Sequence, residues 1–161
     1  MTPNPCNLTV QPGRHNGGVA RPESADLQSI VHRALEQTVN GVAISDPNLP
    51  GNPLVHVNGG FTRITGYTAQ EVLGRNCSFL QGDEHDQPGV HRLREAIARG
   101  EDATVVVRNY RRDGTPFWNR VEMSPVRDES TGHITHFFAV QTDVTLEREK
   151  EEATLVRSLE L

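Results

Sequence analysis

Cysteine and lysine are both scarce in this chain of 161 residues, and long apolar runs are absent. The two cysteines, Cys6 and Cys77, imply no disulfide framework and suit a reducing intracellular compartment. Lys150 is the single lysine, so chemistry that depends on a lysine nucleophile is nearly excluded. Without a membrane-spanning stretch or a basic-then-apolar signal segment, the sequence predicts a cytoplasmic protein that does not enter a membrane.

Positive charge is also in deficit, since 16 Lys and Arg residues face 21 Asp and Glu residues for a net charge of −5. Because phosphate backbones attract basic proteins, direct binding of nucleic acid is not expected. The chain contains no Walker loop, zincin helix, kinase signature or Gly-x-Ser-x-Gly elbow. We therefore expect a protein that is not an enzyme.

The chain divides into a tail, a helix, a core and a second helix. Residues 1–23 hold prolines and glycines with almost no large apolar side chain, which predicts a disordered tail. Residues 24–40 repeat apolar side chains at helical spacing and predict an amphipathic flanking helix. Residues 41–144 have the length of one domain, and residues 145–161 carry a weak helical periodicity that predicts a C-terminal flanking helix.

Within the core, the expected order is two strands, several short helices and three further strands. Short β-prone runs at 42–45 and 54–57 flank a turn rich in proline and glycine. The clearest helix is Pro88–Arg99, with Asp86 as its expected N-cap and Gly100 as its stop signal. The last three strands are expected at about 102–111, 116–127 and 133–144. This order predicts an α+β fold.

Three carboxamides have the parity of the apolar face of these last strands. Asn109 alternates with valines, Asn119 shares a face with Phe117, and Gln141 shares one with Phe137. If that face is buried, the amides need partners, and a planar ligand edge of alternating C=O and N–H groups, such as that of a flavin, provides them. Parity alone equally allows exposed amides at strand ends.

Residues 74–82 read Gly-Arg-Asn-Cys-Ser-Phe-Leu-Gln-Gly and decide between these alternatives. They resemble the GRNCxFLQ signature of light-oxygen-voltage (LOV) domains, a flavin-binding branch of the PAS fold. The resemblance extends over about residues 25–145. Further segments that match in order and spacing are 42–47, 52–54, Phe61, 65–67, Arg94, 109–110, 117–119 and 140–141.

This resemblance implies a PAS-type, five-stranded antiparallel sheet with helices on one face enclosing a flavin, and flanking helices at both ends. It implies a blue-light photoreceptor in which flavin mononucleotide (FMN) is bound non-covalently in the dark. On illumination, the Cys77 thiol would add to flavin C4a while N5 is protonated, and the adduct would break thermally. The Gln141 amide would turn when N5 changes from acceptor to donor, and the signal would pass to the sheet surface and the terminal helices.

The resemblance also implies which residues contact the flavin besides Cys77. These are Ser45, Asn76, Leu80, Gln81, Arg94, Asn109, Asn119, Val121, Met123, Phe137 and Gln141. Ser78 stands where most members of the family carry a second phosphate-binding arginine, so riboflavin is a possible ligand beside FMN and faster dark recovery is expected. Arg92 or His91 are alternative partners for the phosphate.

Two further interpretations concern metals and partners. Glu84, His85, Asp86 and His91, and separately His133 and His136, do not form a convincing ligand shell, so no metal site is expected. The outer sheet face would carry five apolar side chains, Val106, Tyr110, Trp118, Phe138 and Val140. Such a face needs a cover, which predicts a homodimer through this face and the terminal helices, with a monomer covered by its own helices as the alternative. The downstream protein partner is unknown.

Two other functions remain open on the same fold. One is a flavin-based redox-sensing PAS domain, and the other is a flavin-free PAS dimerisation module. Light-induced, reversible loss of the blue absorption band distinguishes the photoreceptor from both.

Overall fold

The computed structural model describes residues 24–161, so the tail expected at 1–23 lies outside the described residues. The elements, in chain order, are α1 (Ser24–Gln37), β1 (Gly41–Ser45), β2 (Leu54–Val57), α2 (Gly59–Thr65), α3 (Ala69–Val72), the 3-10 helix η1 (Cys77–Gln81), α4 (Pro88–Arg99), β3 (Ala103–Tyr110), β4 (Pro116–Arg127), β5 (Ile134–Asp143) and α5 (Thr145–Leu159). The predicted α+β class and the order of strands and helices are confirmed. None of the helices in residues 24–161 combines the length and apolarity that crossing a bilayer requires.

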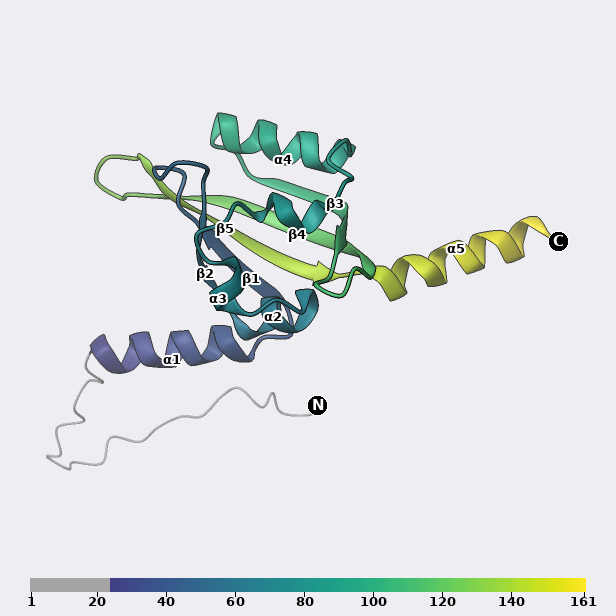
Figure 1. The fold of residues 1–161 in the computed structure, drawn as a ribbon, viewed down its shortest axis with the longest axis horizontal. Coiled ribbons are helices and arrows are strands. Elements are labelled where there is room, and N and C mark those ends of the chain that lie inside the picture. Colours follow the sequence, from purple (N-terminus) through teal and green to yellow (C-terminus); the bar gives the residue numbers. More distant parts are fainter. Residues whose placement is uncertain (1–23) are drawn as a thin grey trace, which may run out of the picture.

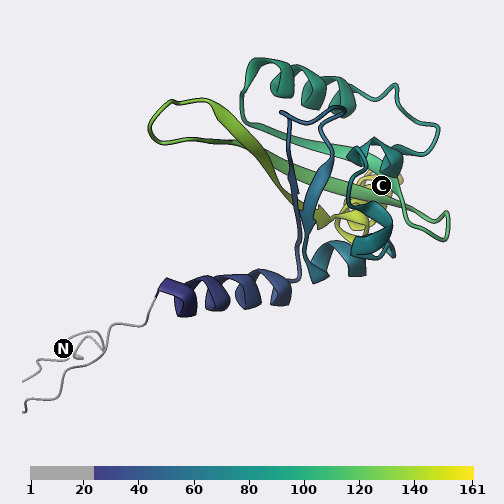
Figure 2. The same cartoon turned by 60° about the vertical axis from the view of Figure 1, so that its left-hand side comes forward.

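All five strands form one antiparallel sheet in the order β2-β1-β5-β4-β3. The sheet therefore places the first and last strands of the core side by side at its centre (Figure 1). The connection from β2 to β3 carries α2, α3, η1 and α4, with α4 lying over one face of the sheet in both views (Figure 2). This arrangement is the predicted sheet with its helices on one face.

Side-chain parity separates the two faces of the sheet as predicted. Asn109, Asn119 and Gln141 are buried, with 4%, 0% and 3% of their surface exposed. Register explains their proximity, because Gln141 lies opposite Val121 on β4, two residues along the same face from Asn119. The alternative of water-exposed amides at strand ends is therefore wrong.

Two apolar clusters fill the space between the sheet and its helices. One lies under α4 and joins Val90 and Ala96 to Val107, Met123 and Phe137. The other lies under the shorter helices and contains Ala43, Leu54, Val57, Phe61, Val72 and Leu80. The core is thus split between the β3–β4 half and the β1–β2 half of the sheet, and side chains of both halves line the cavity described below.

The start of α4 differs from the expectation at its cap. The N-cap residue is Gln87 rather than Asp86, and Asp86 instead contacts His91 at 2.7 Å between Oδ1 and Nε2. The Gln87 side chain does not cap the helix; its Nε2 donates to the Arg108 carbonyl, and its Oε1 accepts from the Arg108 amide. Because this pair of bonds ties α4 to β3, the helix start is set by the sheet rather than by a local cap.

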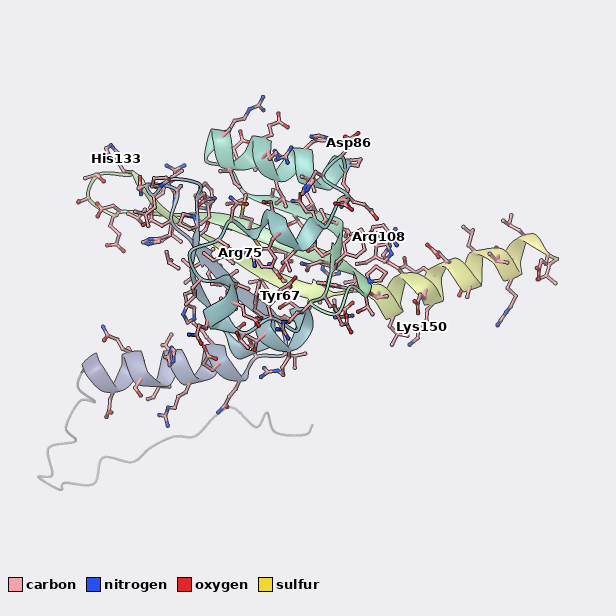
Figure 3. The ribbon with its side chains drawn as sticks, viewed as in Figure 1. Tyr67, Arg75, Asp86, Arg108, His133 and Lys150 are labelled. Atoms are coloured by element: carbon pink, nitrogen blue, oxygen red, sulfur yellow. The ribbon has the colours of Figure 1, made fainter. Side chains whose placement is uncertain are left out.

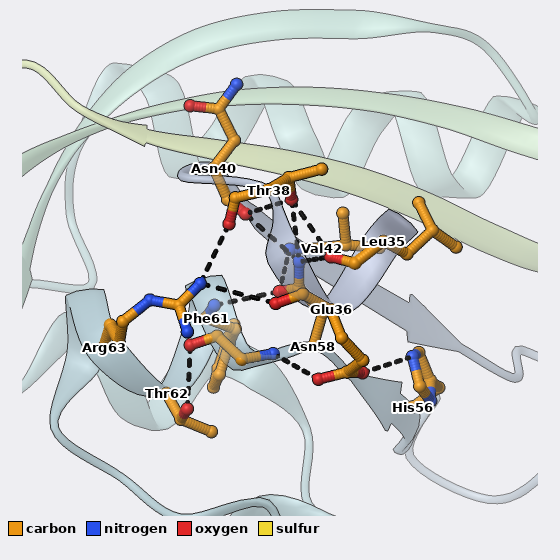
Figure 4. A network of polar contacts seen from close by, with 11 residues as sticks. Leu35, Glu36, Thr38, Asn40, Val42, His56, Asn58, Phe61, Thr62 and Arg63 are labelled. Atoms are coloured by element: carbon orange, nitrogen blue, oxygen red, sulfur yellow. Dashed lines mark hydrogen bonds and ion pairs between the residues drawn. The ribbon is translucent and has the colours of Figure 1, made fainter. Parts of the chain in front are cut away.

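Among the described residues, the hydrogen bonds that attach the terminal helices to the core lie near their inner ends. The C-terminal end of α1 is bound by Asn58, the N-cap of α2, whose Nδ2 donates to the Leu35 carbonyl at 2.6 Å (Figure 4). At the other end, the Thr145 hydroxyl accepts from the Trp118 amide at 2.9 Å, and α5 then runs away from the sheet without a buried residue (Figure 1). Within residues 24–161, neither helix therefore covers the whole outer face of the sheet.

Candidate functional site

A cavity lies between the inner face of the sheet and the segments η1 and α4. Its volume is about 140 Å³, counted as the space that the centre of a water molecule can reach. A single water needs about 10–15 Å³ on this measure, so the cavity has room for a ligand of many atoms. Its wall is mainly apolar with a few polar groups, which is the usual composition of a small-molecule site.

Cys77 is the first residue of η1 and lines this cavity. The Asn76 side chain caps the 3-10 helix by accepting from the Ser78 amide at 2.9 Å, and its Nδ2 donates to the Gly51 carbonyl at 2.7 Å. On the other side of η1, the Phe79 ring packs edge-on against Tyr67 and under the Arg75 guanidinium, both of which are labelled in Figure 3. The helix that carries the thiol is therefore fixed at both its start and its outer side.

The thiol of Cys77 is desolvated although the residue as a whole is only half-buried. Burial raises the pKa of the Cys77 thiol to about 11, and a weak contact from Gln141, with Nε2 at 3.9 Å from Sγ, lowers it slightly. Burial is the larger effect because the thiolate has no positive partner to replace lost hydration. The group is consequently a neutral thiol throughout the physiological pH range.

Two of the three buried carboxamides have an oxygen that accepts no hydrogen bond from residues 24–161. Asn119 Nδ2 donates to Asn109 Oδ1 at 2.9 Å, and Asn109 Nδ2 donates to the Arg108 carbonyl at 3.1 Å. Asn119 Oδ1 and Gln141 Oε1 are buried and accept no hydrogen bond from the described residues. Each such orphan costs about 1–3 kcal/mol, so the arrangement favours a ligand that brings N–H donors into the cavity.

Arg94 supplies the positive charge at this cavity. It lies on α4, is exposed, and forms no ion pair with any other residue in 24–161. Ser78, which stands at the position of the family's second arginine, also lines the cavity. Neither proposed substitute does so: His91 is paired with Asp86, and Arg92 lies 3.7 Å from Glu101. The expectation that His91 or Arg92 replaces the missing arginine therefore finds no support in this geometry.

Most of the residues predicted for the site meet at this one cavity. Those that line it are Ser45, Asn76, Cys77, Gln81, Arg94, Asn109, Val121, Met123, Phe137 and Gln141. Leu80 is not among them and packs within the cluster under the short helices. Asn119 does not reach the wall either and instead holds Asn109 by the bond described above.

Sequence reasoning assigned no ligand role to Asn52, which also lines the cavity. Asn52 has a left-handed backbone with φ of 48°, which asparagine tolerates better than most residues. Its Oδ1 is another buried acceptor that finds no donor in the described part of the chain. Because residues 46–51 read as a turn, the sequence predicted only a loop at Asn52. The one feature that could have indicated a left-handed backbone there is an asparagine at the end of a turn, directly before Pro53.

Comparisons with known proteins agree with this architecture. The model of the PAS domain family matches residues 39–146. A blue-light photoreceptor of Listeria monocytogenes is 42% identical over 120 residues, covering 74% of this chain and 47% of that protein. A blue-light-activated histidine kinase of Brucella canis is 43% identical over 128 residues, covering 76% of this chain and 26% of that protein. The chain thus spans less than half the length of these curated relatives.

Solved structures extend the comparison to three dimensions. An RNA-binding light-oxygen-voltage receptor superposes with a TM-score of 0.77 at 39% identity, covering 96% of this chain and 42% of that one. The light-state LOV structure of the blue-light photoreceptor Aureochrome1 superposes with a TM-score of 0.64 at 38% identity, covering 84% of this chain and 99% of that one.

The sheet order, the helices on one face and the cavity between them define the class, and the chain belongs to the PAS domain family. Within that family it is a LOV domain, since it covers nearly the whole Aureochrome1 LOV chain and carries Gly-Arg-Asn-Cys at 74–77. The resemblance inferred from the sequence is confirmed.

Proposed function

We propose that this LOV domain is a blue-light receptor that holds FMN or riboflavin in the cavity and bonds it reversibly through Cys77. The observation that carries the proposal is the neutral, desolvated thiol on the wall of a cavity lined by amides with free acceptors. Blue-light photoreception by the relatives from Listeria and Brucella supports the same function. The domain would be a two-state switch without catalytic turnover.

The residues of the cavity fit a flavin. Its pyrimidine edge offers an N–H donor between two carbonyls, which complements the amide of Asn109, held by Asn119, and the Gln141 oxygen that accepts no hydrogen bond from residues 24–161. The apolar wall formed by Val121, Met123 and Phe137 suits the faces of the ring system. A bound flavin would supply blue-light absorption and an excited state able to take up a sulfur and a proton, both of which Cys77 would hold at the cavity wall.

Cys77 brings both parts that this reaction needs. Because burial keeps the thiol protonated, the same side chain delivers the sulfur and the proton, and no separate acid is required. The cap by Asn76 and the packing of Phe79 hold the thiol at the cavity wall. The same burial would favour return to the neutral thiol in darkness.

Gln141 would convert the change at the flavin into a change of the protein. Its Nε2 lies near Cys77 Sγ while its Oε1 has no partner, so rotation of the amide exchanges a donor for an acceptor at one position. Gln141 lies in β5, directly opposite Gly41 on β1 and Val121 on β4. Its strand ends two residues before α5, which gives a short path from the amide to the C-terminal helix.

Arg94 is our candidate for the phosphate partner, because it is the unpaired cation at the cavity within residues 24–161. With Ser78 in place of a second arginine, one charge-assisted contact worth about 1.5–3 kcal/mol is missing. We therefore propose a weaker preference for FMN over riboflavin than a pair of arginines would give, together with faster dark recovery.

Absorption spectra of the purified chain test the proposal when they are recorded in the dark, directly after blue light and again after a period of darkness. The expected result is loss of the blue band on illumination and its return in darkness. Cys77→Ala should bind flavin and keep its band under light, while Cys6→Ala is the matched control and should bleach as the wild type does. A band that bleaches reversibly in Cys77→Ala would point to redox sensing, and protein that stays colourless after refolding with flavin would point to a flavin-free module.

A further inference from the structure

A second cluster of potential ligands lies outside the cavity, where α1 meets the edge of the sheet. His32 and Glu36 are four residues apart on α1 and therefore share one face of the helix. His56 lies on β2 and presents its imidazole to the same place. One ligand atom of each residue lies within 4.8 Å of those of the other two.

The carboxylate of Glu36 is already oriented for a further partner. Its Oε2 accepts from the Gly59 amide at 2.8 Å, which leaves Oε1 facing His56 Nε2 at 3.8 Å (Figure 4). The nearby Arg63 guanidinium bonds to the carbonyls of Glu36 and Thr38, and no arginine within residues 24–161 forms an ion pair with this carboxylate. In metal sites, a hydrogen bond to one carboxylate oxygen commonly orients the other oxygen towards the metal ion.

The imidazoles of His32 and His56 are the other two potential metal ligands. The rings of His32 and His56 have centroids 6.0 Å apart with a 59° interplanar angle, so they are not stacked on one another. His32 is exposed and His56 is half-buried, which leaves a side open to solvent. Two imidazoles and one carboxylate with an open position form the donor set of three-ligand zinc sites, and imidazole favours zinc, copper and nickel over magnesium and calcium.

We propose that His32, Glu36 and His56 form a binding site for a divalent transition metal ion, with Zn²⁺ as the representative. The ligand atoms need to approach each other by a small rotation of exposed or half-buried side chains. The bound ion would fasten the last turns of α1 to β2, beside the polar network of Asn58 that already holds the helix (Figure 4). The site is separate from the flavin cavity, which contains none of these three residues.

Short-range patterns in the sequence could not reveal this cluster, because His56 is 20 residues beyond Glu36 and comes from another element. Only the packing of α1 against the start of α2 brings the three side chains together. Of the set weighed from sequence, Glu84, His85, Asp86 and His91, the structure pairs His91 with Asp86, and among residues 24–161 only His32, Glu36 and His56 bring three potential ligands together.

Calorimetric titration of the untagged, chelator-treated chain with ZnCl2 in the dark tests the site. The expected result is one Zn²⁺ per chain, with affinity reduced at least about tenfold in both His32→Gln and His56→Gln. His91→Gln is the matched control, because it removes an exposed histidine that also contacts a carboxylate, and it should bind as the wild type does.

A second readout is the thermal unfolding midpoint from far-ultraviolet circular dichroism, which does not depend on flavin. Zn²⁺ should raise the midpoint in the wild type and in His91→Gln but not in His32→Gln, whose exposed side chain can be replaced without disturbing the fold. Equal affinity in the wild type and His32→Gln, loss of binding in His91→Gln, or absence of binding in the wild type would each overturn the proposal.

Discussion

At the start of η1, a thiol with a pKa of about 11 lies beside an amide whose oxygen has no partner. At neutral pH only roughly one such thiol in ten thousand is ionised. The site therefore suppresses ordinary cysteine reactivity, such as disulfide exchange and oxidation, which requires the thiolate. A buried thiol of this kind reacts only when a partner accepts its proton, and this requirement suits a response that starts with light.

The raised pKa of Cys77 predicts how stability depends on pH. The unfolded thiol ionises near its ordinary pKa of 9.0, whereas the folded thiol stays protonated to about 11. The contribution of Cys77 to stability is thus complete below about pH 9 and is lost as the pH rises through about 11. Denaturant unfolding in the dark should show the wild type losing up to about 2 kcal/mol relative to Cys77→Ala across this window. A constant difference between the two proteins from neutral to alkaline pH would contradict the burial of the thiol.

Ser78 is the residue with which the choice of flavin can be changed. Ser78→Arg should tighten FMN binding by about tenfold or more and leave riboflavin binding nearly unchanged, because only FMN carries the phosphate. Titration of the flavin-free protein with each flavin measures the two affinities. Arg94→Gln is the companion variant and should remove the preference for FMN. If Ser78→Arg changed both affinities equally, the phosphate would not lie near η1 and α4.

At the scale of elements, Asn58 joins three parts of the fold. Its Oδ1 accepts from the amides of Val42 and Phe61 at 2.7 and 2.9 Å, which caps α2 and ties it to β1. Its Nδ2 donates to the Leu35 carbonyl at the end of α1. The residue is 1% exposed, so none of these bonds can be replaced freely by water.

Removal of this side chain should therefore destabilise the fold and release α1. Asn58→Ala is expected to cost about 2–4 kcal/mol, since an N-cap is lost and several buried groups are left unpaired. Asn48→Ala is the control, because its Nδ2 bonds to the carbonyls of Ile134 and Thr135 are exposed, and it should cost less than about 1 kcal/mol. Urea unfolding measures both changes, and limited proteolysis should cut Asn58→Ala between α1 and β1. Similar costs for the two variants would exclude Asn58 as the junction.

Elements with a strong local signal could be predicted from the sequence. Helix α4 has the expected bounds, since proline starts it and glycine ends it, and the alternation in β3 and β4 assigned Asn109 and Asn119 to the buried face. The predicted N-cap of α4, Asp86, was wrong because the actual N-cap residue, Gln87, is held by hydrogen bonds to a distant strand. No local sequence pattern contains that contact. Alternation also identifies faces but not neighbours, so the sheet order came from the family resemblance rather than from periodicity.

The candidate site shows the same division. Cys77, Asn109 and Gln141 were identified because a motif or a face marked them, and all three line one cavity. Asn52 was not predicted at the cavity because its position there depends on a left-handed turn that brings a loop to the cavity wall. Leu80, which the motif also marked, packs in the cluster under the short helices, and its contact with a flavin stays a prediction.

At the scale of the whole molecule, both terminal helices leave apolar surface unburied. On α1, Leu27, Ile30 and Val31 are 50% exposed or more, and on α5, Leu155 and Val156 are 61% and 55% exposed. A 15-residue helix without a buried side chain is marginal in water, so α5 needs a contact that residues 24–161 do not supply. The outer sheet face adds Val106 and the half-buried Trp118, over which Arg148 lies at 4.3 Å.

We therefore expect a homodimer that buries the outer sheet face and the terminal helices. Light scattering coupled to gel filtration should give about twice the chain mass of 17.8 kDa in the dark. Ile30→Glu and Leu155→Glu should each shift the protein towards the monomer, because a buried unpaired carboxylate opposes association. Leu49→Glu is the control, since Leu49 is equally apolar and 47% exposed but lies in the turn between β1 and β2. A wild type that is monomeric at every concentration, or a loss of the dimer in Leu49→Glu alone, would show that these surfaces are not the interface.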